Sequence, residues 1–236
     1  MINRIPCLEA PARWTEAEFI LSDFVVVEPA DKLTIQMQYP LLCMEHAEKQ
    51  CLVRSEVYER LKAASSLLPE GIGLCVWDAW RPFALQKELY EKYSALVTEE
   101  FQLQNCSKEE REAVIRKFVS EPEKNEMVPP VHTTGGSVDV TLVDKTGKLL
   151  SMGTEFDEFS EKSDTAYFEN TSEEEIKKNR RMLYRVMTEA GFTNLPSEWW
   201  HYDYGNRFWG YYMKRPAIYR GVFTKEEING KRRTES

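Results

Sequence analysis

The chain has 236 residues, of which 42% are hydrophobic and 30% are charged, and its formal net charge is -8. This composition is typical of a folded globular protein and excludes the disordered and fibrous classes. The acidic balance disfavours nucleic acid as a partner, because proteins that bind nucleic acid gather Lys and Arg on one face.

The N-terminal segment, residues 1–14, carries Arg4, Glu9 and Arg13 and lacks the apolar core of a secretory signal peptide. No apolar stretch approaches the ~20 residues that cross a bilayer. The five cysteines are odd in number and scattered along the chain, which favours reduced thiols. We therefore expect a cytoplasmic protein without a membrane partner.

The first third of the chain alternates strand and helix patterns. Residues 23–27 and 32–37 are rich in Val, Ile and Thr, which predicts two short strands. Over residues 55–68, apolar side chains recur every three or four positions, which predicts a helix. A buried strand is expected to follow, running from Gly71 to about Trp77.

A proline marks the start of the next predicted helix. Pro82 suits a first helical turn, and the helix is expected to continue to about Gln104. Arg81 then lies at the junction between strand and helix. Ser107 and Glu110 form a capping-box pattern, which predicts another helix through Val119.

The second half of the chain combines hairpin and helix patterns. Residues 138–143 and 148–151 predict a β-hairpin, and residues 199–204 are strongly β-prone. Between them, a capping-box pattern at Ser172 opens a helix that Gly191 ends. Hairpins mixed with helices favour the α+β class. Without a visible repeat or linker, we expect residues 1–236 to form a single domain, with a frayed tail after about residue 225.

The placement of two of the three histidines is informative. His132 begins the run His-Thr-Thr-Gly-Gly-Ser-Val-Asp139, and His201 lies in Ser-Glu-Trp-Trp-His-Tyr. Two imidazoles and one carboxylate commonly bind catalytic zinc and leave a fourth position for water. Asp139 is the natural carboxylate, because an unpaired charge between Val138 and Val140 would be costly to bury. Taken singly, these residues also fit a histidine at a strand end and an aspartate that caps a turn.

Glu198 lies three residues before His201. In an ideal strand, positions 198 and 201 point to opposite faces. We expect a loop or bulge at residues 196–198 that turns Glu198 towards the metal. The alternative is a solvated carboxylate in a loop.

Four ordered motifs link these residues to a known family. They are Trp77-Asp-Ala-Trp-Arg-Pro82, His132-x-x-Gly-x-x-x-Asp139, Met152-Gly-Thr-Glu-Phe-Asp157 and Glu198-Trp-Trp-His-Tyr202. The sequence resembles the zinc D-alanyl-D-alanine dipeptidases of the vancomycin-resistance (VanX-like) type, which are related to D-Ala-D-Ala carboxypeptidases and hedgehog-like zinc folds. The resemblance extends from the first strands to about Tyr204. It implies a small, mostly antiparallel sheet that carries the zinc site and packs against several helices.

The resemblance also implies a role for each candidate residue. His132, Asp139 and His201 would bind Zn²⁺, and Glu198 would be the general base that activates the metal-bound water. This is the usual division of labour in a zinc peptidase.

The remaining implied roles concern charge and the substrate. Arg81 would stabilise the oxyanion. Asp157 would pair with the substrate ammonium group, although it equally fits a loop turn or cap. The family commonly has Ser two residues before the first histidine and Arg after it, where this chain has Pro130 and Thr133. D-Ala-D-Ala is thus the leading substrate, and another short D-amino-acid dipeptide remains open.

Two other functions share the same metal ligands. One is a zinc D,D-carboxypeptidase or endopeptidase that acts on cell-wall peptides. The other is a non-catalytic zinc-binding module, against which the presence of Glu198 and Arg81 argues. The sequence leaves open the oligomeric state, the native divalent metal and the choice between antibiotic resistance and D-alanine recycling.

Overall fold

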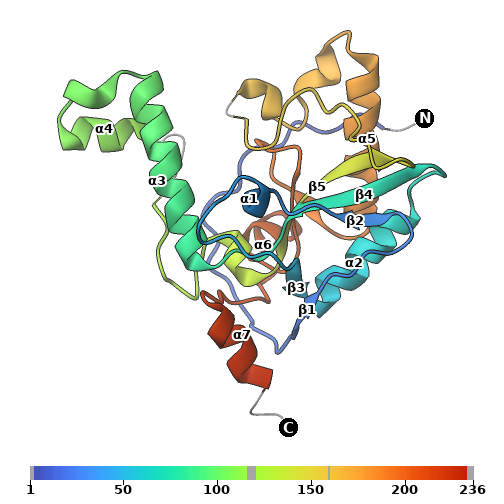
Figure 1. Ribbon diagram of the computed structural model, residues 1–236, viewed down its shortest axis with the longest axis horizontal. Coiled ribbons are helices and arrows are strands. Elements are labelled where there is room, and N and C mark those ends of the chain that lie inside the picture. Colours follow the sequence, from blue (N-terminus) through green and yellow to red (C-terminus); the bar gives the residue numbers. More distant parts are fainter. Residues whose placement is uncertain (1–2, 116–120, 159, 233–236) are drawn as a thin grey trace.

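A five-stranded sheet forms the centre of the molecule (Figure 1). The computed structural model describes residues 3–115, 121–158 and 160–232. The strands follow the order β2 (Leu33–Ile35), β4 (Ile72–Asp78), β5 (Ser137–Asp144), β7 (His201–Asp203) and β6 (Thr193–Asn194). Among these described strands β2 and β4 are parallel, and the other neighbouring pairs are antiparallel. The expected α+β class with a mostly antiparallel sheet is confirmed.

Helices surround the sheet and extend beyond it. The described helices are α1 (Gln38–Leu41), α2 (Ser55–Ser66), α3 (Phe83–Glu100), α4 (Lys108–Ile115), α5 (Glu174–Glu189), α6 (Arg207–Met213) and α7 (Lys225–Arg232). Short 3-10 helices are η1 (Leu103–Asn105), η2 (Val131–Thr134), η3 (Glu161–Ser163) and η4 (Tyr167–Asn170). A separate ladder pairs β1 (Phe24–Val26) with β3 (Leu52–Arg54). In Figure 1, α3 and α4 project from the body as an arm.

The core lies between the two central strands and the helices α2 and α5. Strands β4 and β5 pair from Ile72 opposite Asp144 to Asp78 opposite Asp139, and both faces of β5 are buried. Helix α2 contributes Val57 and Leu61, and α5 contributes Leu183 and Val186, all of them buried. This spacing of three or four residues places apolar side chains on one face of each helix, which explains why these segments fold as helices against the sheet.

Several predicted elements agree with the structure. The strands over residues 23–27 and 32–37 and the helix over residues 55–68 are present with shorter ends. The capping box of α4 is confirmed, because the Ser107 backbone N–H donates to Glu110 Oε2 at 3.0 Å and the Glu110 N–H donates to Ser107 Oγ at 3.3 Å. The predicted end of this helix at Val119 lies outside the described residues.

Other predictions need correction. The capping box at Ser172 does not form, since α5 begins at Glu174 without a side-chain cap. The return limb of the predicted hairpin is a single bridge between Val143 and Leu149, because β5 pairs mainly with β4 and β7. The tail was expected to fray after about residue 225, but residues 225–232 form α7, which buries Ile228 against the body.

The cysteines agree with the expectation of reduced thiols. All five cysteines are free thiols, and Cys75 is buried in the core. Within the described residues, no helix combines the length and the apolar character needed to cross a membrane.

The sheet register places two aspartates and one histidine in one row across neighbouring strands. Asp78 at the end of β4 lies opposite Asp139 on β5, and Asp139 lies opposite His201 on β7. A register shift between Val76 and Asp78 bends β4 at this point. Residues that face one another across neighbouring strands project from the same face of a sheet. The fold therefore gathers side chains that lie 61 and 62 positions apart in the sequence.

Candidate active site

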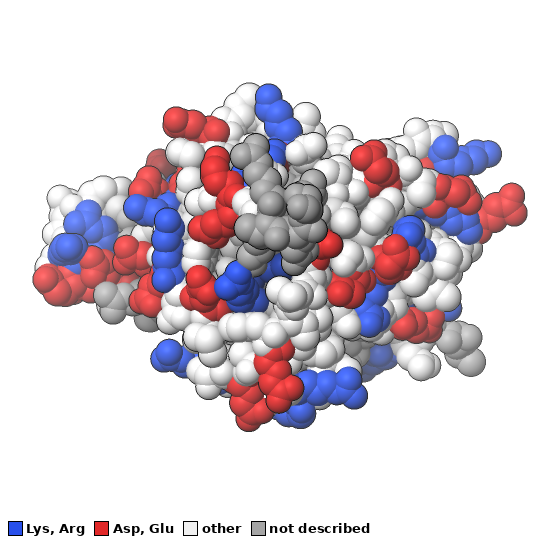
Figure 2. All heavy atoms as spheres, turned by 90° about the horizontal axis from the view of Figure 1, so that it is seen from below, with Lys and Arg blue, Asp and Glu red and all other residues white. Residues whose placement is uncertain are grey.

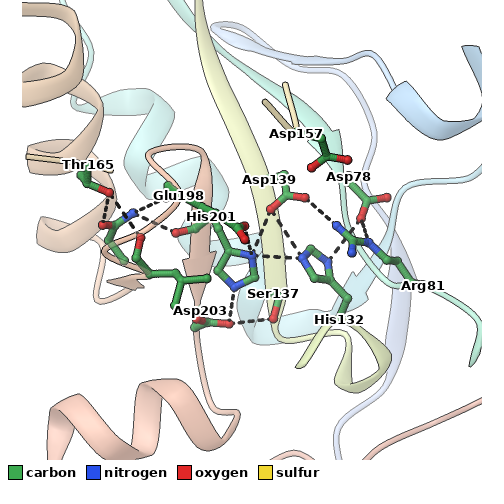
Figure 3. Close-up of polar contacts among 12 residues, drawn as sticks. Asp78, Arg81, His132, Ser137, Asp139, Asp157, Thr165, Glu198, His201 and Asp203 are labelled. Carbon is green, nitrogen blue, oxygen red and sulfur yellow. Dashed lines mark hydrogen bonds and ion pairs between the residues drawn. The ribbon is translucent and has the colours of Figure 1, made fainter. Parts of the chain in front are cut away.

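The fourth member of this cluster, His132, comes from the 3-10 helix that precedes β5. Helix η2 ends at Gly135, whose φ of 72° is left-handed, and the chain then enters β5. Glycine adopts this conformation without steric cost, so Gly135 allows the tight turn between η2 and β5. As Figure 3 shows, the imidazoles of His132 and His201 face each other beside the Asp139 carboxylate.

Three donor atoms in this cluster form a nearly regular triangle. His132 Nε2 lies 3.1 Å from His201 Nδ1, and His201 Nδ1 lies 3.1 Å from Asp139 Oδ1. The third edge, from His132 Nε2 to Asp139 Oδ1, measures 3.5 Å. Tetrahedral zinc with bonds of about 2.0–2.1 Å keeps its ligand atoms roughly 3.3–3.4 Å apart. The donor set and its spacing therefore fit a single zinc-sized cation.

The other nitrogen of each imidazole has a protein partner. His132 Nδ1 lies 2.7 Å from the carbonyl oxygen of Ala79, and His201 Nε2 lies 3.0 Å from Asp203 Oδ1. Both partner atoms are acceptors, so these nitrogens would carry the protons when a cation occupies the triangle. This arrangement leaves His132 Nε2 and His201 Nδ1 as lone-pair donors inside the triangle.

The second oxygen of Asp139 is held by Arg81. The Arg81 guanidinium donates from Nη2 to Asp139 Oδ2 at 2.9 Å and from Nε to Asp78 Oδ2 at 2.5 Å. Burial opposes ionisation of Asp139, but the charges of His132 and Arg81 and the hydrogen bonds from both histidines hold its pKa well below its usual range. Asp139 is therefore an ionised carboxylate that directs one oxygen into the triangle.

Glu198 reaches the cluster through a turn. The His201 backbone N–H donates to the Glu198 carbonyl at 3.2 Å, so residues 198–201 form a turn in which Trp199 and Trp200 are not part of a strand. The expected loop at residues 196–198 is present, whereas the predicted strand over residues 199–204 shortens to His201–Asp203. Glu198 Oε2 lies 3.8 Å from His201 Nδ1, with the Glu198 side chain 38% exposed.

The environment of Glu198 changes its acidity. Removal from bulk water, together with the negative charges of Asp139 and Asp157, raises the pKa of Glu198 to about 7, against the opposing charge of His201. A carboxyl group with a pKa near neutrality can both accept and donate a proton at physiological pH.

Asp157 occupies an unusual backbone conformation close to these charges. Its φ is 58°, and its Oδ2 atom accepts hydrogen bonds from Tyr39 Oη at 2.7 Å and from Tyr93 Oη at 2.5 Å. Burial raises the pKa of Asp157, while the positive charge of Arg81 lowers it.

The two positions that depart from the family pattern, Pro130 and Thr133, bond to each other. Pro130 precedes η2, and Thr133 Oγ1 donates back to the Pro130 carbonyl at 2.7 Å. Thr133 is fully buried. The remaining histidine, His46, is exposed, and its Nδ1 lies 3.0 Å from Glu88 Oε2.

Sequence reasoning did not single out several residues that support the cluster, namely Asp78, Asp203, Tyr39, Tyr93 and Asn194. Asn194 Nδ2 donates to the carbonyl oxygens of Glu198 at 3.1 Å and His201 at 2.9 Å. A signal for the two aspartates was present, because Asp78 follows Trp77 and Asp203 follows Tyr202 inside β-prone apolar runs. The burial argument applied to Asp139 covers them equally. The tyrosines and Asn194 carry no such local signal, since only the tertiary fold brings them to the site.

Comparison with known proteins adds independent information. A family model described as D-Ala-D-Ala dipeptidase matches residues 41–217, a range that contains every candidate site residue. The D-alanyl-D-alanine dipeptidase of Synechocystis sp. is 29% identical, covering 68% of this chain and 72% of that protein. The Escherichia coli D-alanyl-D-alanine dipeptidase is 28% identical, covering 78% and 83%. The Enterococcus faecalis enzyme of that name is 32% identical, covering 56% and 62%.

A solved structure is also similar to this chain. The vancomycin-resistance D,D-pentapeptidase VanY from a VanB-type cassette, in complex with Zn(II), covers 73% of this chain and 85% of its own, with 15% identity and a TM-score of 0.40.

Proposed function

Since the chain belongs to the D-Ala-D-Ala dipeptidase family of peptidases, we propose that it is a zinc metallopeptidase that hydrolyses D-alanyl-D-alanine. The observation that carries the proposal is the triangle of His132 Nε2, Asp139 Oδ1 and His201 Nδ1, whose edges measure 3.1, 3.1 and 3.5 Å. A structural zinc site usually has four protein ligands, whereas three ligands with an open position are typical of catalysis.

We assign the metal to these three side chains. A zinc ion held there supplies Lewis-acid chemistry, because it lets water lose a proton near neutral pH and polarises a carbonyl oxygen. Arg81 keeps Asp139 ionised and restricts it to one inward oxygen. The hydrogen bonds of both imidazoles fix which nitrogen faces the triangle.

Glu198 acts as the general base in this proposal. Its carboxylate lies at the edge of the triangle and is partly exposed, so water and substrate can reach it. With a pKa of about 7, it accepts a proton from the attacking water and then returns that proton to the leaving amine.

Two further charged groups have roles in this proposal. The Arg81 guanidinium lies within the charged cluster and stabilises the negative charge that develops on the carbonyl oxygen. Asp157 binds the free ammonium group of the dipeptide. In support, Tyr39 and Tyr93 fix its Oδ2 atom, so that the carboxylate has a defined orientation.

The substrate and its setting follow from the same features. Pro130 and Thr133 replace the serine and arginine that are common in the family. Neither side chain offers a free polar group to the dipeptide, because proline has none and the Thr133 hydroxyl donates to the Pro130 carbonyl. A closely related short D-amino-acid dipeptide therefore stays within the proposal. We further propose that residues 1–236 act as one domain in the cytoplasm on dipeptides from cell-wall metabolism. A buried cluster whose members extend from Val27 to Tyr219 supports the one-domain part.

A substrate panel tests the function. The zinc-loaded protein is assayed with free D-Ala-D-Ala, its L,L and mixed stereoisomers, and N-acetyl-D-Ala-D-Ala. We expect release of D-alanine from the free D,D-dipeptide and little from the acetylated one, because acetylation removes the charge that Asp157 binds. Cleavage restricted to the acetylated substrate would identify a carboxypeptidase instead, and no cleavage of any substrate would contradict the proposal.

A further inference from the structure

The side of His201 that faces away from the triangle contacts a second polar cluster, which Figure 3 shows below the ring. Asp203 Oδ1 lies 3.0 Å from His201 Nε2 and accepts hydrogen bonds from Ser137 Oγ at 2.7 Å and Asn206 Nδ2 at 2.6 Å. Asn206 Nδ2 also donates to Ser137 Oγ at 2.9 Å. All four residues are buried, and Asp203, Ser137 and Asn206 have no exposed surface.

A buried carboxylate of this kind is costly unless its partners repay the loss of water. Asp203 concentrates its three hydrogen bonds on one oxygen, and its Oδ2 atom has no hydrogen-bond partner. Asp203 and Ser137 also lie opposite each other in the register of β5 and β7. The fold thus orients one specific oxygen towards His201 at the expense of the other.

On this basis, and resting on the proposed zinc-peptidase function, we propose that Asp203 is a positioning residue for the metal. Held by Ser137 and Asn206, it fixes the ring orientation and tautomer of His201 so that Nδ1 faces the ion. A carboxylate is an acceptor only, so the nitrogen that it contacts carries the proton. Carboxylates placed behind a ligating imidazole also make it a better donor to the metal.

The two histidines are supported differently. His132 Nδ1 has two acceptors, the backbone carbonyl of Ala79 at 2.7 Å and Asp78 Oδ2 at 3.3 Å. His201 Nε2 contacts Asp203 Oδ1 at 3.0 Å. Asn206 further joins this support to α6, because its Oδ1 atom accepts from the backbone N–H groups of Phe208 and Trp209 at the start of that helix. The position of His201 is thus coupled to a helix outside the sheet.

The test measures zinc affinity rather than turnover. Asp203→Asn keeps the size of the side chain and an acceptor oxygen but removes the charge. We expect its zinc dissociation constant, measured by competition with a chromophoric chelator, to rise about 10- to 100-fold. The visible spectrum of the cobalt-substituted variant should also shift, because the ligand field of His201 changes. Circular dichroism of the metal-free proteins verifies that the variant folds like the wild type.

A matched control separates positioning from general stability. Glu169→Gln removes another buried, hydrogen-bonded carboxylate, which lies on η4 and contacts Arg181 instead of the site. It should lower stability and leave zinc affinity and the cobalt spectrum unchanged. Wild-type zinc affinity and an unchanged cobalt spectrum in Asp203→Asn would overturn the positioning role, as would equal weakening in Glu169→Gln. A wild-type protein that binds zinc but cleaves no dipeptide would overturn the proposed function alone.

Discussion

At the scale of single residues, neighbouring carboxylates differ in protonation because their partners differ. Asp139 is enclosed by His132, His201 and Arg81, and its pKa lies well below the usual range. Glu198 is only a few ångströms away, but burial and the negative charges of Asp139 and Asp157 outweigh the positive charges of His201 and Arg81 and raise its pKa to about 7. One carboxylate is suited to hold a metal, and the other to move a proton.

Replacement of Glu198 by alanine tests this division. Because Glu198 does not belong to the donor triangle, Glu198→Ala should bind zinc with the stoichiometry of the wild type. Loss of the general base should lower kcat by about 10²- to 10⁴-fold. Metal analysis and dipeptide kinetics check both expectations. The control Glu123→Ala, at an exposed position, should behave like the wild type, and a variant of Glu198 with full activity would rule out its catalytic role.

At the scale of elements, local patterns in the sequence predicted much of the fold. Periodic apolar positions predicted α2, since burial against one face imposes that spacing, and runs rich in Val, Ile and Thr predicted β1 and β2. The predictions for the start of α5 and for the second strand of the hairpin were wrong, because tertiary contacts can override local cap and turn patterns. His132, Asp139 and His201 could be named from their motifs, whereas Tyr93 and Asn194 could not, as only the packing of distant elements brings them to the site.

The join between η2 and β5 provides a test at this scale. A methyl group added at Gly136 would lie 2.3 Å from the Tyr204 carbonyl oxygen and 3.0 Å from the Tyr219 ring. To relieve this contact, the backbone directly after β7 would have to move. That movement would disturb the register of β7 with β5, which places Asp139 opposite His201. Gly136→Ala should therefore lower the free energy of unfolding by about 1–3 kcal/mol and weaken zinc binding.

Urea unfolding and chelator competition measure these two effects. Gly230→Ala is the matched control, because an added methyl group there meets nothing within 4 Å and the position lies in α7. Alanine favours a helix over glycine by about 1 kcal/mol, so the control should keep or slightly raise stability. If Gly136→Ala proved as stable as this control, the join would not depend on close backbone contact.

At the scale of the whole molecule, Glu169 connects the N-terminal segment to the body. Its Oε1 atom accepts hydrogen bonds from the Ile5 backbone N–H at 3.1 Å and from Arg181 Nε at 2.8 Å, and its Oε2 atom contacts Arg181 and Arg4. Burial alone would raise the pKa of Glu169, but the bonds to Arg181 and Ile5 outweigh it and lower the pKa. The Glu169 carboxylate thus connects Arg4 and Ile5 of the N-terminal segment to Arg181 of α5.

This connection predicts how stability depends on pH. A carboxyl group whose pKa is lower in the folded state stabilises the fold above its ordinary pKa, and the contribution disappears as the pH falls through the folded-state value. Glu169→Gln should therefore cost about 1–3 kcal/mol near neutral pH, because Arg181 loses its charged partner. The deficit should shrink at acidic pH. Urea unfolding from pH 7 down to pH 3 checks this, and a constant deficit would show that the charge of Glu169 is not what stabilises the connection.

The central claim is that His132, Asp139 and His201 hold one catalytic zinc ion, and anomalous X-ray scattering at the zinc edge tests it most directly. Crystals of the zinc-loaded protein should give one strong anomalous peak about 2.0–2.2 Å from His132 Nε2, Asp139 Oδ1 and His201 Nδ1. A peak elsewhere, or no peak at this triangle in protein that hydrolyses the dipeptide, would contradict the account.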